Sequence, residues 1–122
     1  MRAIYPAGKT AFLRGQVDMV TDTIRAQLVS SAYDPNDTVI TDVAGHVGVS
    51  VVLSGVTVTN GVADGDDIVF PDVTGEPVKA VVLYKDGGTL ISYADQRADT
   101  LPIDITPNGG DITMTFQYLV KI

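Results

Sequence analysis

The stretch Val78-Lys79-Ala80-Val81-Val82-Leu83-Tyr84 decides the fold class. From Ala80 to Tyr84 it is continuously apolar, and its valines favour an extended chain because branching at Cβ restricts χ1 in a helix. A strand that is apolar on both faces is typical of the middle of a sheet whose two sides are covered. Asp86-Gly87-Gly88 is a turn signal, and an apolar segment, 90–94, follows it. We therefore predict a central strand at 78–84 and a neighbouring strand at 90–94.

Shorter segments on either side alternate apolar and polar residues, as half-buried strands do. This alternation predicts strands over 23–29, 47–53, 101–105 and 112–118. In the first of them, Arg25 and Gln27 are expected on the face that points away from the core. In the second, Val47, Val49, Val51 and Leu53 are expected to share one face of the strand.

A hairpin and one ambiguous segment lie between these strands. Asn60-Gly61 tolerates positive φ at both positions, so it predicts a two-residue hairpin between 56–59 and a strand that starts at Val62. Residues 38–43 fit either a helical turn or a strand.

The N-terminal residues have a different pattern. Residues 1–5 are expected to be extended, and Pro6 suits the first turn of a helix because its missing N–H has no intrahelical partner there. Gly15 can end that helix in a left-handed conformation. A helix this short does not persist without packing, and Phe12 and Leu13 are expected to supply it.

The composition favours an all-β protein. Val, Thr and Ile make up 40 of the 122 residues, and Asp outnumbers Glu by 14 to one. Asp favours turns because its short side chain bonds nearby backbone, whereas Glu favours helices. We predict one all-β domain over residues 1–122, a sandwich or barrel-like arrangement of roughly eight strands with one or two short helical turns near the N-terminus. Residues 1–17 are expected to form an N-terminal arm and the short helix.

The chain carries no catalytic signature. It has no Cys and a single His, His46, which excludes thiol chemistry and a multi-histidine metal site. Nothing in the sequence fixes a carboxylate and a nucleophile beside His46, as general base catalysis requires. Asp64-Gly65-Asp66-Asp67 lacks the alternating spacing and the distal Glu of an EF-hand, so we interpret it as an acidic turn. We predict a protein that is not an enzyme and that holds no cofactor and no metal.

The charge is acidic and unevenly distributed. The net charge is −7, residues 63–122 hold four basic and ten acidic side chains, and residues 1–17 hold three basic side chains and no acidic one. An acidic domain is a poor partner for nucleic-acid phosphates and for anionic membrane surfaces, so we predict that it binds neither. The basic start either docks on an acidic partner or is a solvated terminus with scattered charges.

Five residues of the N-terminal segment are the candidate partner-binding set: Arg2, Ile4, Tyr5, Lys9 and Arg14. Tyr5 is the candidate exposed anchor, because an aromatic ring buries a large area at low entropy cost; the alternative is that it folds back on its own domain. Residues 1–5 offer backbone groups for adding a strand to a partner's sheet, and we expect them to lie against another chain. The competing arrangement is an edge strand of their own domain.

Three ordered stretches carry a resemblance to a known family. They are Tyr5-Pro6-Ala7-Gly8-Lys9 with Asp18 and Asp22-Thr23-Ile24-Arg25-Ala26-Gln27-Leu28-Val29, then Val81-Val82-Leu83-Tyr84-Lys85-Asp86, then Pro107-Asn108-Gly109-Gly110-Asp111-Ile112-Thr113. In this order and spacing they resemble small virion proteins of tailed bacteriophages and prophages. That family has a short helix, an Asp-Thr-Ile-Lys-type strand, a Tyr-Lys-Asp strand end and an Asn-Gly turn. This chain departs from it after Asp86-Gly87-Gly88, where relatives often have a longer Gly/Thr-rich loop.

The resemblance implies a structural protein of the virion with no catalytic residues. Within that role we expect a capsid decoration or cement protein on the exterior of the capsid. Its partners would be the major capsid protein and copies of itself, as a trimer if it clamps a local threefold axis. The alternative is a tail or neck component, since both roles need an acidic β-domain with edges to cover. A third alternative is a small glycan-binding module, which requires exposed aromatic side chains in a groove.

Overall fold

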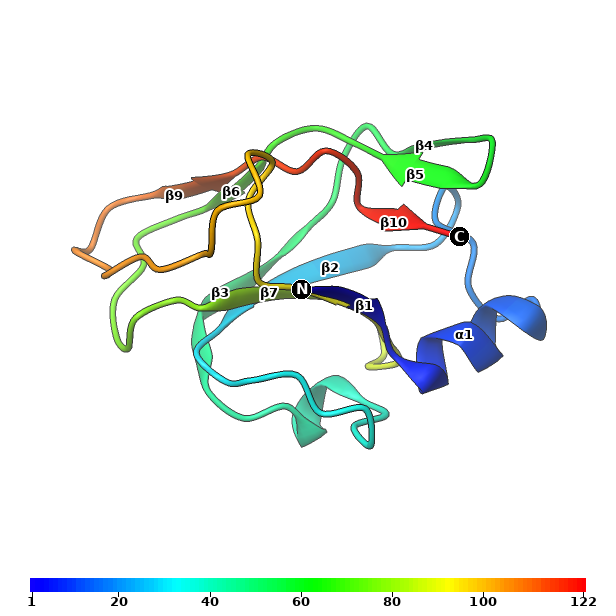
Figure 1. Cartoon of the computed structure of the whole chain (residues 1–122), viewed down its shortest axis with the longest axis horizontal. Coiled ribbons are helices and arrows are strands. Elements are labelled where there is room, and N and C mark those ends of the chain that lie inside the picture. Colours follow the sequence, from blue (N-terminus) through cyan, green and yellow to red (C-terminus); the bar gives the residue numbers. More distant parts are fainter.

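Ten strands form three antiparallel sheets in the computed structural model, which describes residues 1–122 (Figure 1). The largest sheet has the order β1-β8-β7-β2-β3, with strands Arg2–Ile4, Leu90–Ala94, Ala80–Lys85, Ile24–Val29 and His46–Val52. The second sheet has the order β10-β5-β4, with strands Val120–Lys121, Val62–Asp64 and Thr57–Thr59. The third sheet pairs β6, Ile68–Phe70, with β9, Ile112–Met114. One α-helix, α1 (Pro6–Leu13), and one 3-10 turn (Ile40–Asp42) accompany them, so the all-β class is confirmed.

The prediction of a central strand is confirmed by β7. It lies in the middle of the five-stranded sheet, and Ala80–Tyr84 are all buried. One face of this sheet packs against the two smaller sheets in a main cluster of 20 buried residues, in which Val81 and Phe70 take part. The other face carries a second cluster of eight buried residues, among them Val82 and Tyr93. Because both faces are covered, every side chain along this strand can be apolar.

The hairpin prediction is also confirmed. Asn60 and Gly61 have φ of 53° and 78°, and they join β4 to β5. The ambiguous segment 38–43 contains the 3-10 turn, in which the carboxylate of Asp42 accepts hydrogen bonds from the N–H groups of Thr38 and Val39.

The prediction that β2 is half-buried is wrong, because the second buried cluster covers the face on which Gln27 and Val29 lie, and a bulge in β3 supplies hydrogen-bond acceptors there. The ladder between β2 and β3 shifts register between Ala26 and Leu28, and Gly48 at the bulge has φ of 70°. Gln27 is buried, and its amide donates to the carbonyl oxygens of Leu28, Val47 and Gly48 at 3.0, 3.1 and 3.2 Å. Val49 points to solvent instead of the core. A bulge leaves carbonyls unpaired, and a buried amide is the donor that satisfies them.

Two C-terminal predictions are corrected. Residues 101–105 form only isolated bridges, because Pro102 has no N–H to give to a ladder. The expected strand 112–118 is interrupted: β9 ends at Met114, and β10 begins at Val120 as a strand of a different sheet. Three strands, β1, β6 and β10, add to the roughly eight expected and one, 101–105, is lost, which gives ten.

Helix α1 begins at Pro6 as predicted, and Gly15 has φ of 68° just beyond its end. The packing prediction is half right. Phe12 is half-buried against the main cluster, but Leu13 is 89% exposed.

The buried residues of α1 are Gly8 and Ala11, so the helix packs through its smallest side chains. A Cβ on Gly8 would lie 2.7 Å from the carbonyl oxygen of Ile91 and 2.9 Å from that of Leu90. The helix therefore lies directly on the backbone of β8, which fixes its position next to β1.

Candidate docking groove

The N-terminal segment is an edge strand of its own domain, which is the competing arrangement, and its contact with another chain stays a prediction. Arg2–Ile4 pair antiparallel with Ser92–Ala94 of β8. Tyr5 is 1% exposed, and its ring centroid lies 5.1 Å from that of Tyr33. Burial raises the pKa of the Tyr5 hydroxyl far above its usual range. The domain itself supplies an apolar site for this ring, so Tyr5 is a core residue and not an exposed anchor.

A groove of about 660 Å³ lies between the N-terminal and C-terminal segments of the chain. Its lining comes from residues 2–4 of β1, Lys9, Phe12 and Leu13 of α1, Tyr33, residues 92–94 of β8, and residues 118–122. In Figure 1, α1 and β10 lie toward the right-hand end of the molecule, and β1 runs from the middle of the view toward α1. The lining contains three cationic side chains and no Asp or Glu. We call this feature the basic groove.

Arg2 connects the two walls of the basic groove. Its Nη2 donates to the carbonyl oxygen of Tyr118 at 2.8 Å, and its Cζ lies 4.2 Å from the centroid of the Tyr118 ring and 5.2 Å from that of Phe116. The Nζ atom of Lys121 lies 5.8 Å from the same Tyr118 ring. Stacking and one hydrogen bond hold the guanidinium in place, and a guanidinium has further N–H donors for a carboxylate.

The unpaired cations of the molecule concentrate at this end. Four of the eight Lys and Arg side chains form ion pairs: Arg25 with Asp86, Lys79 with Asp104, Lys85 with Asp22 and Arg97 with Asp99. The other four, Arg2, Lys9, Arg14 and Lys121, have no carboxylate within ion-pair distance. Three of these four line the basic groove. In a protein with a net charge of −7, the groove is therefore a local site of positive potential.

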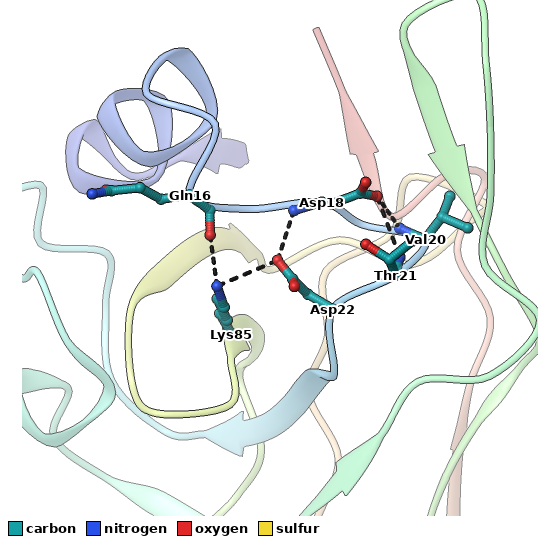
Figure 2. A network of polar contacts seen from close by, with 6 residues as sticks. All are labelled: Gln16, Asp18, Val20, Thr21, Asp22 and Lys85. Carbon is teal, nitrogen blue, oxygen red and sulfur yellow. Dashed lines mark hydrogen bonds and ion pairs between the residues drawn. The ribbon is translucent and has the colours of Figure 1, made fainter.

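A polar network holds the loop that leads from α1 to β2 (Figure 2). The network comprises Gln16, Asp18, Val20, Thr21, Asp22 and Lys85. The Nζ atom of Lys85 donates to the carbonyl oxygen of Gln16 at 2.7 Å and lies 3.4 Å from the Asp22 carboxylate. The Asp18 carboxylate accepts from the N–H groups of Val20 and Thr21, and these bonds hold the pKa of Asp18 below its usual value. The network fixes the loop that follows the helix.

Apolar side chains surround the same end of the molecule. A smaller cavity of about 390 Å³ shares Phe12, Val120 and Ile122 with the basic groove and adds Val20 and Val58 to the apolar lining. At least half of the surface of Val20, Val58 and Ile122 is exposed. Apolar side chains that gather beside unpaired charges are typical of surfaces that meet another protein.

The structure brings together three of the five residues predicted to bind a partner. Arg2, Ile4 and Lys9 line the basic groove. Arg14 is exposed after the end of α1 and does not line the groove, and Tyr5 lies in the second buried cluster.

Sequence reasoning missed the opposite wall of the groove, above all Tyr118 and Lys121. One signal was available: residues 112–122 contain a Lys and no acid, in the half of the chain that holds ten acidic side chains. Like residues 1–17, this segment has basic but no acidic side chains. Only the folded structure shows that the two segments lie next to each other.

His46 and the acidic side chains lie outside the basic groove. The Nε2 atom of His46 lies 3.1 Å from the carbonyl oxygen of Ile40, and His46 is exposed. No group of three or more His, Asp or Glu side chains is placed to hold a metal ion. No helix is long and apolar enough to span a membrane. No known protein family, curated protein or solved structure matches the chain.

Proposed function

We propose that this protein is a non-enzymatic docking subunit, namely a capsid decoration protein that binds the outside of a bacteriophage head. The basic groove carries this proposal: three cations without ion-pair partners lie beside apolar side chains in an otherwise acidic domain. An apolar surface with charge around it suits a protein partner. The resemblance of the three ordered stretches to small virion proteins supplies the partner, the major capsid protein.

A decoration protein stabilises a head by mass action. A protein that binds only the assembled lattice stabilises each site by RT ln(1 + [L]/Kd), which is about 2.7 kcal/mol at a free concentration of 100 Kd. The test is thermal disruption of purified heads with and without this protein. We expect decorated heads to withstand a higher temperature. Equal disruption temperatures, or absence of the protein from purified heads, would refute the proposal.

Copy number separates the head from the neck and tail. Quantitative gel analysis of purified particles should give hundreds of copies for a shell protein, because a capsid lattice repeats its sites many times. A dozen copies or fewer would assign the protein to the neck or tail.

Self-association is part of the same proposal. β4 is the outer strand of its sheet, and all three of its residues are exposed, so its edge is open to a second copy. We expect a homo-oligomer on the particle, a trimer where it clamps a local threefold axis. A strict monomer at every lattice position in a reconstructed head would exclude this part of the proposal.

A further inference from the structure

We infer that the basic groove binds its partner by strand addition: an extended, acidic segment of another protein lies between β1 and β10 and hydrogen-bonds to their free edges. The inference deepens the proposed function, on which it rests for the existence of a protein partner. The bound segment is a strand-forming peptide in which carboxylate side chains alternate with apolar side chains.

Both walls of the groove are strand edges. β1 is the outer strand of the five-stranded sheet, and β10 is the outer strand of the three-stranded sheet. Residues of both strands line the same groove. Each outer strand presents a row of N–H and C=O groups without a strand partner, which is the template that β-strand addition uses.

The hydrogen-bond pattern shows which backbone groups are free. The N–H of Tyr5 donates to Ile91, and the carbonyl of Met1 accepts from Asp95, both on the β8 side. Backbone groups of successive residues alternate between the two edges of a strand, so those of Arg2 and Ile4 point to the outer edge.

The same reasoning applies to β10. The N–H of Ile122 donates to Gly61 on the β5 side at 2.9 Å. The backbone groups of Lys121 therefore point to the outer edge, toward the groove.

Charge complementarity selects an acidic occupant. Arg2, Lys9 and Lys121 line the groove without ion-pair partners, and no acidic side chain lines it. Successive side chains of a strand point to opposite faces. One face of the bound segment would therefore present carboxylates to the cations, and the other would present apolar side chains to Ile4 and Phe12.

The test uses the whole protein and three labelled peptides in fluorescence anisotropy. The first probe is a peptide of about seven residues that alternates Asp and Val, which is longer than either edge strand. The second has Asn in place of Asp, and the third is the first peptide with N-methyl groups on alternate backbone amides. We expect the first probe to bind and each of the others to bind about tenfold more weakly, because they lose charge-assisted pairs or backbone hydrogen bonds.

Two matched lysine variants locate the bound peptide. Lys121→Gln should weaken binding of the Asp-Val peptide by about two- to fivefold, as for a partly exposed ion pair. Lys79→Gln makes the same change on an exposed lysine outside the groove and should leave binding unchanged. No binding of the first probe at about 1 mM, equal binding of the N-methylated probe, or equal effects of the two variants would overturn the inference.

Further outcomes separate this inference from the proposed function. If a second copy fills the groove, analytical ultracentrifugation of the protein alone will show self-association that Lys121→Gln abolishes, and the assignment to a different protein is then overturned. If the protein is present on heads but Lys121→Gln attaches as well as the unchanged chain, the groove inference fails and the proposed function stands. If the peptides bind as expected and the protein is absent from heads, the proposed function fails and the groove inference stands.

Discussion

At the scale of single residues, Asp18 makes the clearest electrostatic contribution. Hydrogen bonds from the N–H groups of Val20 and Thr21 lower its pKa in the folded protein. The unfolded chain has the ordinary value of about 3.9, so the folded state binds the proton less well than the unfolded state does. The contribution to stability is therefore fully present above that value and is lost as the pH falls through the lower, folded value.

We predict that Asp18→Asn removes this pH-dependent part of the stability. The Asn side-chain oxygen can still accept from the same N–H groups, so the variant should fold. Urea unfolding from pH 2 to pH 7 should show the wild type more stable than the variant near neutrality, with the gap closing as the pH falls through the acid range. A gap that is the same at every pH would mean that the Asp18 carboxylate is not the cause.

Tyr5 and Gln27 show that the burial of a single side chain cannot always be predicted from the local sequence. Gln27 is expected to face outward, Tyr5 is expected either to be an exposed anchor or to fold back on its own domain, and both are buried. The Gln27 amide is satisfied by carbonyls at the bulge of β3, and the site of Tyr5 is formed by Tyr33 and Tyr93, which come from distant segments. Local alternation carries no information about either neighbour.

At the scale of elements, the contact of α1 with β8 is the most sensitive. Gly8→Ala would bring a Cβ within 2.7 Å of the Ile91 carbonyl oxygen, which is backbone and cannot rotate away. We predict a loss of about 1–3 kcal/mol in the free energy of unfolding, because the helix must shift from the sheet. Thr10→Ala in the same helix is exposed and should be neutral or slightly stabilising, since Ala has the higher helix propensity. Equal urea midpoints for the two variants would contradict the close packing of Gly8 on β8.

The β4–β5 hairpin offers a second matched pair of variants. Gly61 and Gly15 have similar φ, 78° and 68°, so Ala at either position suffers about 1–2 kcal/mol of left-handed strain. A Cβ on Gly61 would also lie 2.9 Å from the Ile122 carbonyl oxygen, whereas nothing lies within 4 Å of a Cβ on Gly15. We predict that Gly61→Ala lowers the melting temperature more than Gly15→Ala does. The reverse order would show that β10 does not pack against the turn.

Elements with a strong local signal were predictable, and those set by partners were not. The apolar run of β7 and the Asn60-Gly61 turn can be predicted from local sequence. A strand buried on both faces needs apolar residues at every position, and a two-residue hairpin needs residues that tolerate positive φ. The division of 112–118 into β9 and β10 depends on two different partner strands, β6 and β5, which residue alternation does not encode. Alternation of burial does continue from Ile112 to Tyr118 even where the strand is interrupted.

At the scale of the whole molecule, the cations that line the basic groove differ from the cations that form ion pairs within the fold. Lys9 and Lys121 are exposed and unpaired, so we predict that Lys9→Gln and Lys121→Gln change the free energy of unfolding by no more than about 0.5 kcal/mol. Lys85→Gln removes a hydrogen bond to Gln16 and an ion pair with Asp22, and should cost about 1 kcal/mol. A larger loss at Lys9 or Lys121 than at Lys85 would show that the groove cations serve stability.

Half of the candidate site could be found from charge along the chain. The three cations of residues 1–17 mark the N-terminal wall of the groove, although Arg14 lies outside it. The C-terminal wall was missed because Lys121 is a single cation and Tyr118 belongs to an alternating apolar series. Tyr118 and Lys121 belong to the candidate site because the fold places them opposite Arg2, and the sequence alone does not show that proximity.

The pairing of β1 with β8 has a consequence for the order of events during synthesis. Arg2 meets Ala94 and Ile4 meets Ser92, so β1 is synthesised long before the strand with which it pairs. Such distant pairings make folding slow, in the range of milliseconds to seconds. Until residues 92–94 emerge, Tyr5 has no pocket, and the nascent N-terminus stays accessible. A ribosome-bound chain stalled before residue 90 should therefore be cut by protease within residues 1–5, whereas the folded chain of residues 1–122 should resist.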